Sequence, residues 1–183
     1  MGELTTLLAA ARKGDSLAAS QAFSLLYEDL RRLARSRLRQ HQSMTLLDTT
    51  SLVHESYLKF IGLESLPVED RKHFFTYAAT VMRSVIVDFA RARQAERRGG
   101  EADHLVLDTA LSEKLTGPEN DVLRVHEALN VLAQADPALA QLVELRYFGG
   151  LTETEIAEMQ GVSERTVRRN WGKAKLLLTA ALS

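Results

Sequence analysis

Residues 144–178 constrain the fold most strongly, because two helical patterns there flank a single glycine. The first helix is expected at residues 153 to about 160. Thr152 is its predicted N-cap, and Glu155, three residues on, completes a capping box. Gly161 follows, and glycine tolerates the positive φ that a tight turn requires. A helix, a tight turn and a second helix in this order predict a helix-turn-helix.

The second helix of this pair carries a basic face. Ser163 is its predicted cap, and Val167 and Trp171 form its buried stripe. In a chain of net charge -1, the segment from residue 162 to 175 has one acidic residue, Glu164, and five cationic ones: Arg165, Arg168, Arg169, Lys173 and Lys175. Helix pairs around a glycine also occur in bundles that never touch nucleic acid. The local basicity favours a helix that lies in the major groove of DNA.

The rest of the chain also predicts helices and no strands. Leu, Ala, Arg and Glu dominate, only three prolines occur among 183 residues, and no strand-like alternation is present. The expected fold class is therefore all-α. Apolar spacing and breakers place further helices at residues 16–40, 49–62, 74–82, 85–97, 121–133 and 138–148.

Residues 99–117 predict a flexible linker. They lack helical periodicity, begin with two glycines and end next to Gly117–Pro118. We therefore expect two small helical domains, 1–98 and 118–183, with the helix-turn-helix in the second. The first domain also has a basic helix, because residues 71–98 contain seven cationic and two acidic residues.

Composition argues against an enzyme. The absence of cysteine excludes disulfides, thiolate metal sites and a cysteine nucleophile. The five histidines have no metal-binding spacing, and no phosphate-binding glycine loop occurs. We expect no catalytic residues, no metal and no cofactor. The apolar runs are too short for a membrane span, and residues 1–8 lack signal-peptide features, so a cytoplasmic protein without a membrane partner is expected.

Four segments together resemble the ECF sigma factors, the compact promoter-specificity subunits of bacterial RNA polymerase. They are TTSLVHESYLKFIG, RSVIVDFARARQAERR, GPEND and LRYFGGLTETEIAEMQGVSERTV, and the resemblance covers nearly the full chain. It implies that residues 1–98 are a sigma-2-like domain for polymerase binding and for minus-ten recognition and melting. Residues 99–117 are then the linker, and residues 118–183 a sigma-4-like domain for the minus-thirty-five element.

The resemblance also implies roles for the basic residues. Arg83 and Ser84 align where the family holds a flipped base of the nontemplate strand. Nearby phosphate contacts would come from Arg91, Arg93 and Arg97. Toward the minus-thirty-five element the family match places Arg168, Arg169, Gly172 and Lys173, beside the exposed Arg165. Gly172 departs from the bulkier residues common there, and we interpret it as permitting close backbone approach to DNA.

Residues 52–59 resemble the helix with which the family binds core RNA polymerase. The positions carried over are Leu52, Val53, Glu55, Tyr57, Leu58 and Lys59. The alternative is that the aliphatic positions among them, Leu52, Val53 and Leu58, are core. Both interpretations are compatible, since one helix has two faces.

The segment just ahead of this helix departs from the family pattern. Most members have an acidic cluster there, whereas this chain has Asp48, Thr49, Thr50 and Ser51. It resembles the subtype that lacks the acidic polymerase-binding motif and is switched on by a Ser/Thr protein kinase. A phosphate would restore the charge at a helix N-terminus. We favour Thr50, then Thr49, then Ser51. The alternative is that these residues only cap the helix.

The rival hypothesis is a helix-turn-helix transcriptional regulator that binds an operator independently of polymerase. Such proteins usually read palindromes as dimers, and this sequence has no obvious heptad or dimerisation element. A sigma factor is instead expected to bind duplex promoter DNA poorly alone and to copurify with core polymerase.

Overall fold

The structure of the chain, a computed structural model, describes residues 3–40, 47–61, 70–99 and 118–182. Its regular elements are all helical and these ranges contain no strand, which confirms the predicted all-α class. The elements are α1 (Glu3–Ala11), α2 (Ser16–Gln40), α3 (Thr49–Ile61), α4 (Arg71–Gly99), α6 (Pro118–Ala135), α7 (Pro137–Val143), the π-helical turn η2 (Glu144–Phe148), α8 (Glu153–Gln160) and α9 (Glu164–Leu182). The short helix α1 was not anticipated.

Helix α2 has the bounds that its apolar spacing predicts. Asp15 starts it, because its carboxylate accepts hydrogen bonds from the backbone N–H groups of Leu17 and Ala18, both at 3.0 Å. One face then enters the core with Ala22, Leu26, Leu30, Leu33 and Ala34. The helix is therefore set by an N-cap and a regular apolar stripe, both of which are local signals.

Helix α4 corrects one expectation. The sequence predicted two pieces, 74–82 and 85–97, but α4 is one continuous helix from Arg71 to Gly99. The polar residues between the two pieces, Arg83 and Ser84, have partners on neighbouring helices, so the helix continues through them. Its buried face runs along both pieces and includes Phe74, Ala78, Met82, Val85 and Ile86.

The helix predicted at residues 138–148 is divided into α7 and the π-helical turn η2. Asp136 caps α7, accepting from the backbone N–H of Leu139 at 3.1 Å, and Pro137 occupies the first helical position. At the other end, the N–H of Gly149 bonds to the carbonyl of Glu144, five residues back, at 2.9 Å. This wider turn ends the helix ahead of the loop at residues 149–152.

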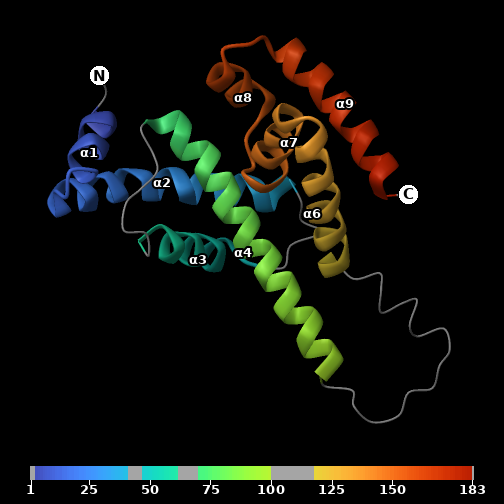
Figure 1. Cartoon of the computed structure of the whole chain (residues 1–183). Coiled ribbons are helices and arrows are strands. Elements are labelled where there is room, and N and C mark those ends of the chain that lie inside the picture. Colours follow the sequence, from blue (N-terminus) through green and yellow to red (C-terminus); the bar gives the residue numbers. More distant parts are fainter. Residues whose placement is uncertain (1–2, 41–46, 62–69, 100–117, 183) are drawn as a thin grey trace.

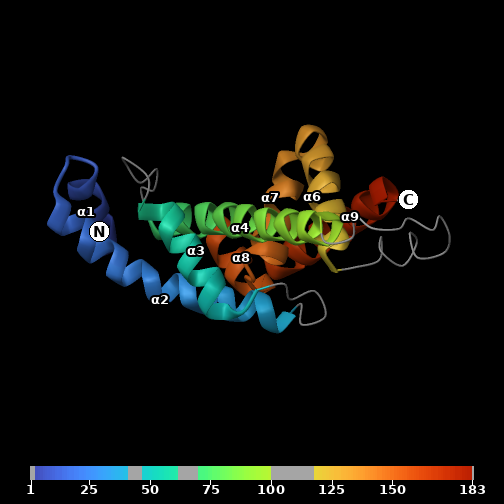
Figure 2. The same ribbon diagram turned by 90° about the horizontal axis from the view of Figure 1, so that it is seen from below.

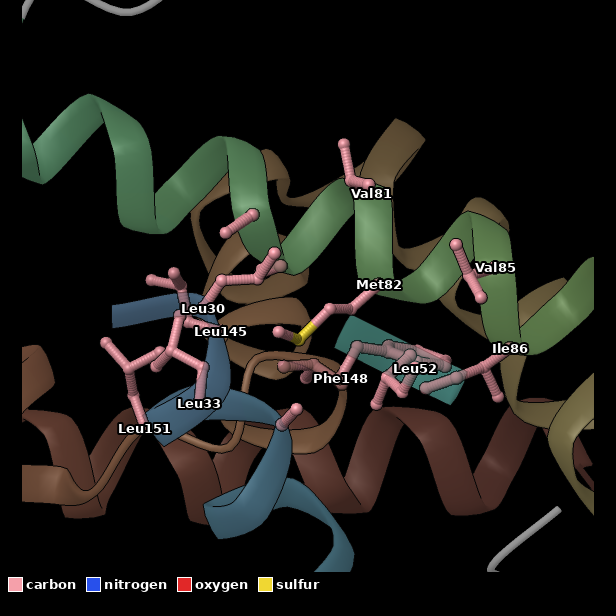
Figure 3. Close-up of a cluster of buried hydrophobic side chains, with 14 of the residues drawn as sticks. Leu30, Leu33, Leu52, Val81, Met82, Val85, Ile86, Leu145, Phe148 and Leu151 are labelled. Carbon is pink, nitrogen blue, oxygen red and sulfur yellow. The ribbon is translucent and has the colours of Figure 1, made fainter. Parts of the chain in front are cut away.

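We call α1 to α4 the N-terminal half and α6 to α9 the C-terminal half. Figures 1 and 2 show α4 lying between α3 and α6, and α4 contacts both of them as well as η2. The buried side chains form one cluster that draws on both halves. In Figure 3, Met82 of α4 and Phe148 of η2 point toward each other within this cluster. The predicted linker lies outside the described residues apart from Gly99, and the division into two domains stays a prediction.

None of the helices in the described ranges combines the length and apolar character needed to cross a membrane.

Candidate nucleic-acid interface

The segment from α8 to α9 has the local geometry that its sequence predicts. Thr152 accepts from the backbone N–H of Glu155 at 3.2 Å, and the Glu155 carboxylate accepts from the N–H of Thr152 at 2.8 Å, which completes the capping box. Gly161 has φ +68° at the turn. Ser163 then caps α9 by accepting from the N–H of Thr166 at 3.2 Å. These local bonds determine where both helices begin.

Helix α9 has an apolar inner face and a basic outer face. Val167 and Ala174 are buried, and Trp171 packs against the core beside them. Arg165 and Arg169 are exposed on the opposite side of the helix, where the spacing of four residues aligns them. Figure 1 shows α9 as the last helix, ending at the C-terminus. Its outer face therefore presents two aligned guanidinium groups to solvent.

Two other predicted DNA contacts on α9 already pair with acidic residues. Arg168 lies 3.0 Å from Glu153 and 3.7 Å from Glu164, and Lys173 lies 3.4 Å from Asp136. Both cationic side chains remain more than half exposed. Exposed ion pairs contribute only about 0–1 kcal/mol, so a phosphate oxygen can replace the carboxylate at little cost.

Gly172 lies within α9 on its outer side, between Arg169 and Leu176. A methyl group added there would meet no atom within 4 Å. Among the described residues, no packing contact therefore requires a glycine at this position.

Arg146 and Glu153 contact α9 through Trp171 and Arg168, and neither residue was among the predicted site residues. The Arg146 guanidinium covers the Trp171 ring at 4.7 Å from its centroid and donates to Glu153 at 2.6 Å. Hydrogen bonds from Arg146 and then from Arg168 lower the pKa of Glu153. The carboxylate thus stays ionised and links η2 and α8 to α9. No local sequence signal predicts this cluster, because Arg146 lies on η2, Glu153 on α8, and their partners Trp171 and Arg168 on α9.

On α4, Arg83 points into the contact with the C-terminal half rather than toward solvent. It donates from Nε to Nδ1 of His126 at 3.1 Å and from Nη1 to Glu144 at 3.2 Å. Its Nη2 donates to the carbonyl oxygen of His126 at 3.1 Å and to the side chain of Asn130. Thr80, one turn earlier on α4, donates to the other Glu144 oxygen at 3.1 Å. Arg83 was a predicted site residue, whereas none of these partners was predicted.

His126 is held in its neutral form by this arrangement. Burial, and then the nearby charges of Arg83 and Arg91, lower its pKa, while Glu127 and Asp88 raise it. Nδ1 accepts from Arg83, and the side-chain amide nitrogen of Asn130 lies 3.4 Å from Nε2, so both ring nitrogens face hydrogen-bond donors. Protonation of Nδ1 would remove that acceptor and place a second positive charge beside the guanidinium.

Ser84 and Lys59, assigned above to DNA and to polymerase, contact each other. The Lys59 ammonium donates to the Ser84 hydroxyl at 2.6 Å and to the Asp88 carboxylate at 2.7 Å. These bonds join α3 to α4 near the surface, where both Lys59 and Asp88 remain exposed. The two predicted surfaces therefore meet at one polar cluster.

The end of α4 carries the predicted phosphate contacts. Arg91 and Arg93 are exposed, and the Arg93 guanidinium lies 5.8 Å from the centre of the Phe89 ring. Arg97 belongs to the last turns of the same helix, but its side chain lies outside the described residues. Figure 1 shows these last turns extending beyond α6.

Helix α3 separates its predicted polymerase residues onto two faces. Leu52 and Val53 are buried in the core, which agrees with the alternative interpretation given for them above. Tyr57 is partly buried and meets the ring of Tyr27 edge-on at 5.8 Å. The exposed side of the helix carries Glu55, Leu58 and Lys59. The surface open to a partner is thus limited to this second group.

The three hydroxyl residues at the start of α3 are not equivalent. Asp48 caps the helix by accepting from the backbone N–H and from the hydroxyl of Ser51, both at 3.0 Å. The backbone bond, and then the hydroxyl bond, lower the pKa of Asp48. Thr50 is exposed, whereas Thr49 and Ser51 are partly buried. Capping therefore involves Asp48 and Ser51 rather than Thr50.

Comparison with known protein families gave a match that includes both basic helices, α4 and α9. The family model described as ECF sigma factor matches residues 1–183, the whole chain. No curated protein and no solved structure matches the chain.

Proposed function

The chain belongs to the ECF sigma factor family, and from this premise we propose that it binds core RNA polymerase and directs initiation at specific promoters. The family acts in transcription initiation and is not a family of enzymes. The observation that carries the proposal is the outer face of α9, where Arg165 and Arg169 are exposed opposite a buried apolar face.

In this proposal α8 and α9 are a helix-turn-helix, and α9 enters the major groove of the minus-thirty-five element. Arg165 and Arg169 reach the DNA directly, while Arg168 and Lys173 exchange their carboxylate partners for phosphates. The gap at Gly172 lets the helix backbone approach the duplex. Residues 118–183 then act as the sigma-4-like domain and residues 1–98 as the sigma-2-like domain, with residues 99–117 as the linker.

The minus-ten element is assigned to α4. Arg91, Arg93 and Arg97 follow the phosphates of the melted nontemplate strand, and Arg83 and Ser84 hold a flipped base. The exposure of Arg91 and Arg93 at the end of the helix supports the first assignment. Arg83 takes its role only when the C-terminal half leaves α4, because its hydrogen bonds are directed to that half.

Core polymerase is assigned to the exposed face of α3. Leu58 supplies an apolar contact, being 43% exposed, and Glu55 and Lys59 supply charged contacts around it. Leu52 and Val53 support this face from the core, and Tyr57 forms its edge. An apolar centre with a charged rim is the usual anatomy of a protein interface.

Binding to polymerase is proposed to be regulated by a Ser/Thr protein kinase that phosphorylates Thr50. Two observations favour Thr50 over its neighbours in the first turn of α3: its side chain is exposed while those of Thr49 and Ser51 are partly buried, and the hydroxyl of Ser51 is already bonded to Asp48. A phosphate adds about −1.5 to −2 charges at neutral pH and is favoured at a helix N-terminus. It therefore supplies the negative charge that the family's acidic cluster normally provides.

Run-off transcription with purified core polymerase tests the main proposal. Arg169→Ala is expected to lower initiation at a promoter that the chain recognises. The control is Arg35→Ala on the exposed side of α2, which also removes one positive charge and is expected to leave initiation unchanged. The proposal fails if the chain gives no initiation with core polymerase in any phosphorylation state and instead binds duplex DNA tightly alone. That outcome identifies an operator-binding regulator.

The phosphorylation proposal has its own test. Thr50→Glu is expected to tighten binding to core polymerase relative to Thr50→Ala, while Ser51→Ala leaves binding close to that of the unchanged chain. Affinity is measured with labelled chain and purified core. Equal affinities for Thr50→Glu and Thr50→Ala would rule out a charge switch at this residue while leaving the sigma-factor proposal intact.

A further inference from the structure

The contact between the halves uses nearly all the hydrogen-bonding capacity of Arg83. Its guanidinium makes four hydrogen bonds, all to side-chain or backbone atoms of the C-terminal half. The side chains of Arg83 and Glu144 are each only 15% exposed. An arginine has five N–H donors in a planar fork, so a nucleotide reaches this one only by displacing the existing partners.

Close backbone packing reinforces the same contact. Phe148 is fully buried, and the Arg83 guanidinium lies 5.9 Å from the centre of its ring. The loop that follows lies directly on the N-terminal half: a methyl group added at Gly149 would come within 3.0 Å of the side chain of Ala79, and one at Gly150 within 2.4 Å of the backbone of Arg37. Figure 3 shows Phe148 among side chains of the N-terminal half.

Two polar bonds connect α2 to the same part of the C-terminal half. Arg32 pairs with Glu155 of α8, and the Ser36 hydroxyl donates to the carbonyl oxygen of Gly150 at 2.5 Å. Together with Arg83 and Thr80, these bonds tie both α2 and α4 to η2, α6 and α8. Arg83, one of the residues assigned to promoter recognition, is therefore covered by the half that carries α9, whereas Arg91 and Arg93 of the same helix remain exposed.

One buried charge opposes this closure. Arg37 of α2 is 1% exposed, and its Nε and Nη1 atoms have no hydrogen-bond partner in the described structure. Its guanidinium lies 5.1 Å from the centre of the Tyr147 ring, and burial lowers its pKa. Burying a guanidinium without partners is unfavourable, and separation of the halves would rehydrate it.

We propose that this contact is an autoinhibitory latch, in which Glu144, His126 and Asn130 hold Arg83 away from promoter DNA until the two halves separate. The free chain alternates between this closed form and an open form that exposes Arg83. Glu144 favours the closed form, and the buried Arg37 favours the open one. The functional consequence rests on the promoter role of Arg83 proposed above, whereas the opening itself does not.

Three substitutions shift the equilibrium of the latch, two toward the open form and one toward the closed form. Glu144→Gln keeps the shape and an acceptor oxygen but removes the negative charge opposite Arg83, and weakening a charge-assisted hydrogen bond in this way shifts the equilibrium by up to about tenfold, here toward opening. Thr80→Val removes the second bond to Glu144 at nearly constant volume and shifts it the same way by a smaller factor. Arg37→Met replaces the buried charge with a shorter, unbranched apolar chain and favours closure.

Opening is measured by energy transfer between dyes at Ala92→Cys on α4 and Val131→Cys on α6, both exposed positions in a chain without native cysteine. We expect transfer to fall in Glu144→Gln and, less, in Thr80→Val, and to rise in Arg37→Met. Affinity for a fluorescein-labelled pool of random-sequence single-stranded DNA is expected to rise in the variants that open and to fall in Arg37→Met. If only the open form binds, Glu144→Gln tightens the apparent affinity by up to about tenfold.

These experiments distinguish failure of the latch from failure of the promoter role of Arg83. Unchanged energy transfer in Glu144→Gln and Thr80→Val, with both variants folded by circular dichroism, overturns the latch. If transfer changes as expected but DNA binding does not, and Arg83→Ala leaves binding unaltered as well, the latch stands and the promoter role of Arg83 is wrong. Tighter binding in Glu144→Gln that Arg83→Ala abolishes supports both.

Discussion

Replacing Gly172 with alanine is expected to stabilise the protein and weaken its DNA binding at the same time. Gly172 lies in the interior of α9, has no positive φ, and an added methyl group would meet nothing within 4 Å. Alanine restricts the unfolded chain and favours the helix, which together amount to about 1 kcal/mol. For a chain of this size that corresponds to an increase in Tm of roughly 2–4 °C.

Gly14→Ala provides the matched control. Its added methyl group would also meet no atom within 4 Å, but Gly14 has φ +94°. Alanine is strained in that conformation by about 1–2 kcal/mol, so the same substitution is expected to lower Tm. The two variants therefore separate backbone conformation from steric space.

Thermal unfolding by circular dichroism and binding to promoter DNA in the presence of core polymerase are the two assays. The stability argument is refuted if Gly172→Ala leaves Tm unchanged or lowers it. If Tm rises but promoter affinity is unaltered, the glycine does not serve close approach to DNA, and the role assigned to the gap in α9 is wrong.

Three further predictions follow from the same structure. Thr152→Ala removes the capping box of α8 and is expected to lower the free energy of unfolding in urea by about 1 kcal/mol; an unchanged midpoint would contradict the cap. His126 has a pKa lowered from 6.5 by burial and then by Arg83, so its stabilising contribution is complete above pH 6.5 and is lost as the pH falls through the lowered value. His126→Gln is expected to flatten the dependence of unfolding free energy on pH over that interval. Arg169→Ala is expected to reduce the slope of log affinity against log salt concentration for promoter DNA by about one, and an unchanged slope would mean that it contacts no phosphate.

Local signals were sufficient for the helices that position α9. The predicted bounds of α2 and of α8 agree with the structure, as do the capping box at Thr152 and the positive φ of Gly161. Each of these features depends on atoms only a few residues apart along the chain, so the sequence contains all of the information.

The break predicted within α4 was wrong. Arg83 and Ser84 separate the two predicted pieces, but Met82, Val85 and Ile86 are buried and keep the helical spacing across them. In the folded chain their partners come from other helices, Glu144 of η2 for Arg83 and Lys59 of α3 for Ser84. Tertiary contacts thus satisfied the polar groups that the local pattern left unexplained.

By itself the sequence determined the fold class, the bounds of α2 and α8 and the residues on the outer face of α9, since periodicity and capping act within one or two helical turns. Only the tertiary structure decided that Arg83 faces the C-terminal half and that Arg37 is buried without hydrogen-bond partners at Nε and Nη1. The partners of Arg83 lie 43 to 61 residues away along the chain. Which of them meet depends on how whole helices pack, because side chains so distant in sequence are brought together only by the shared apolar core.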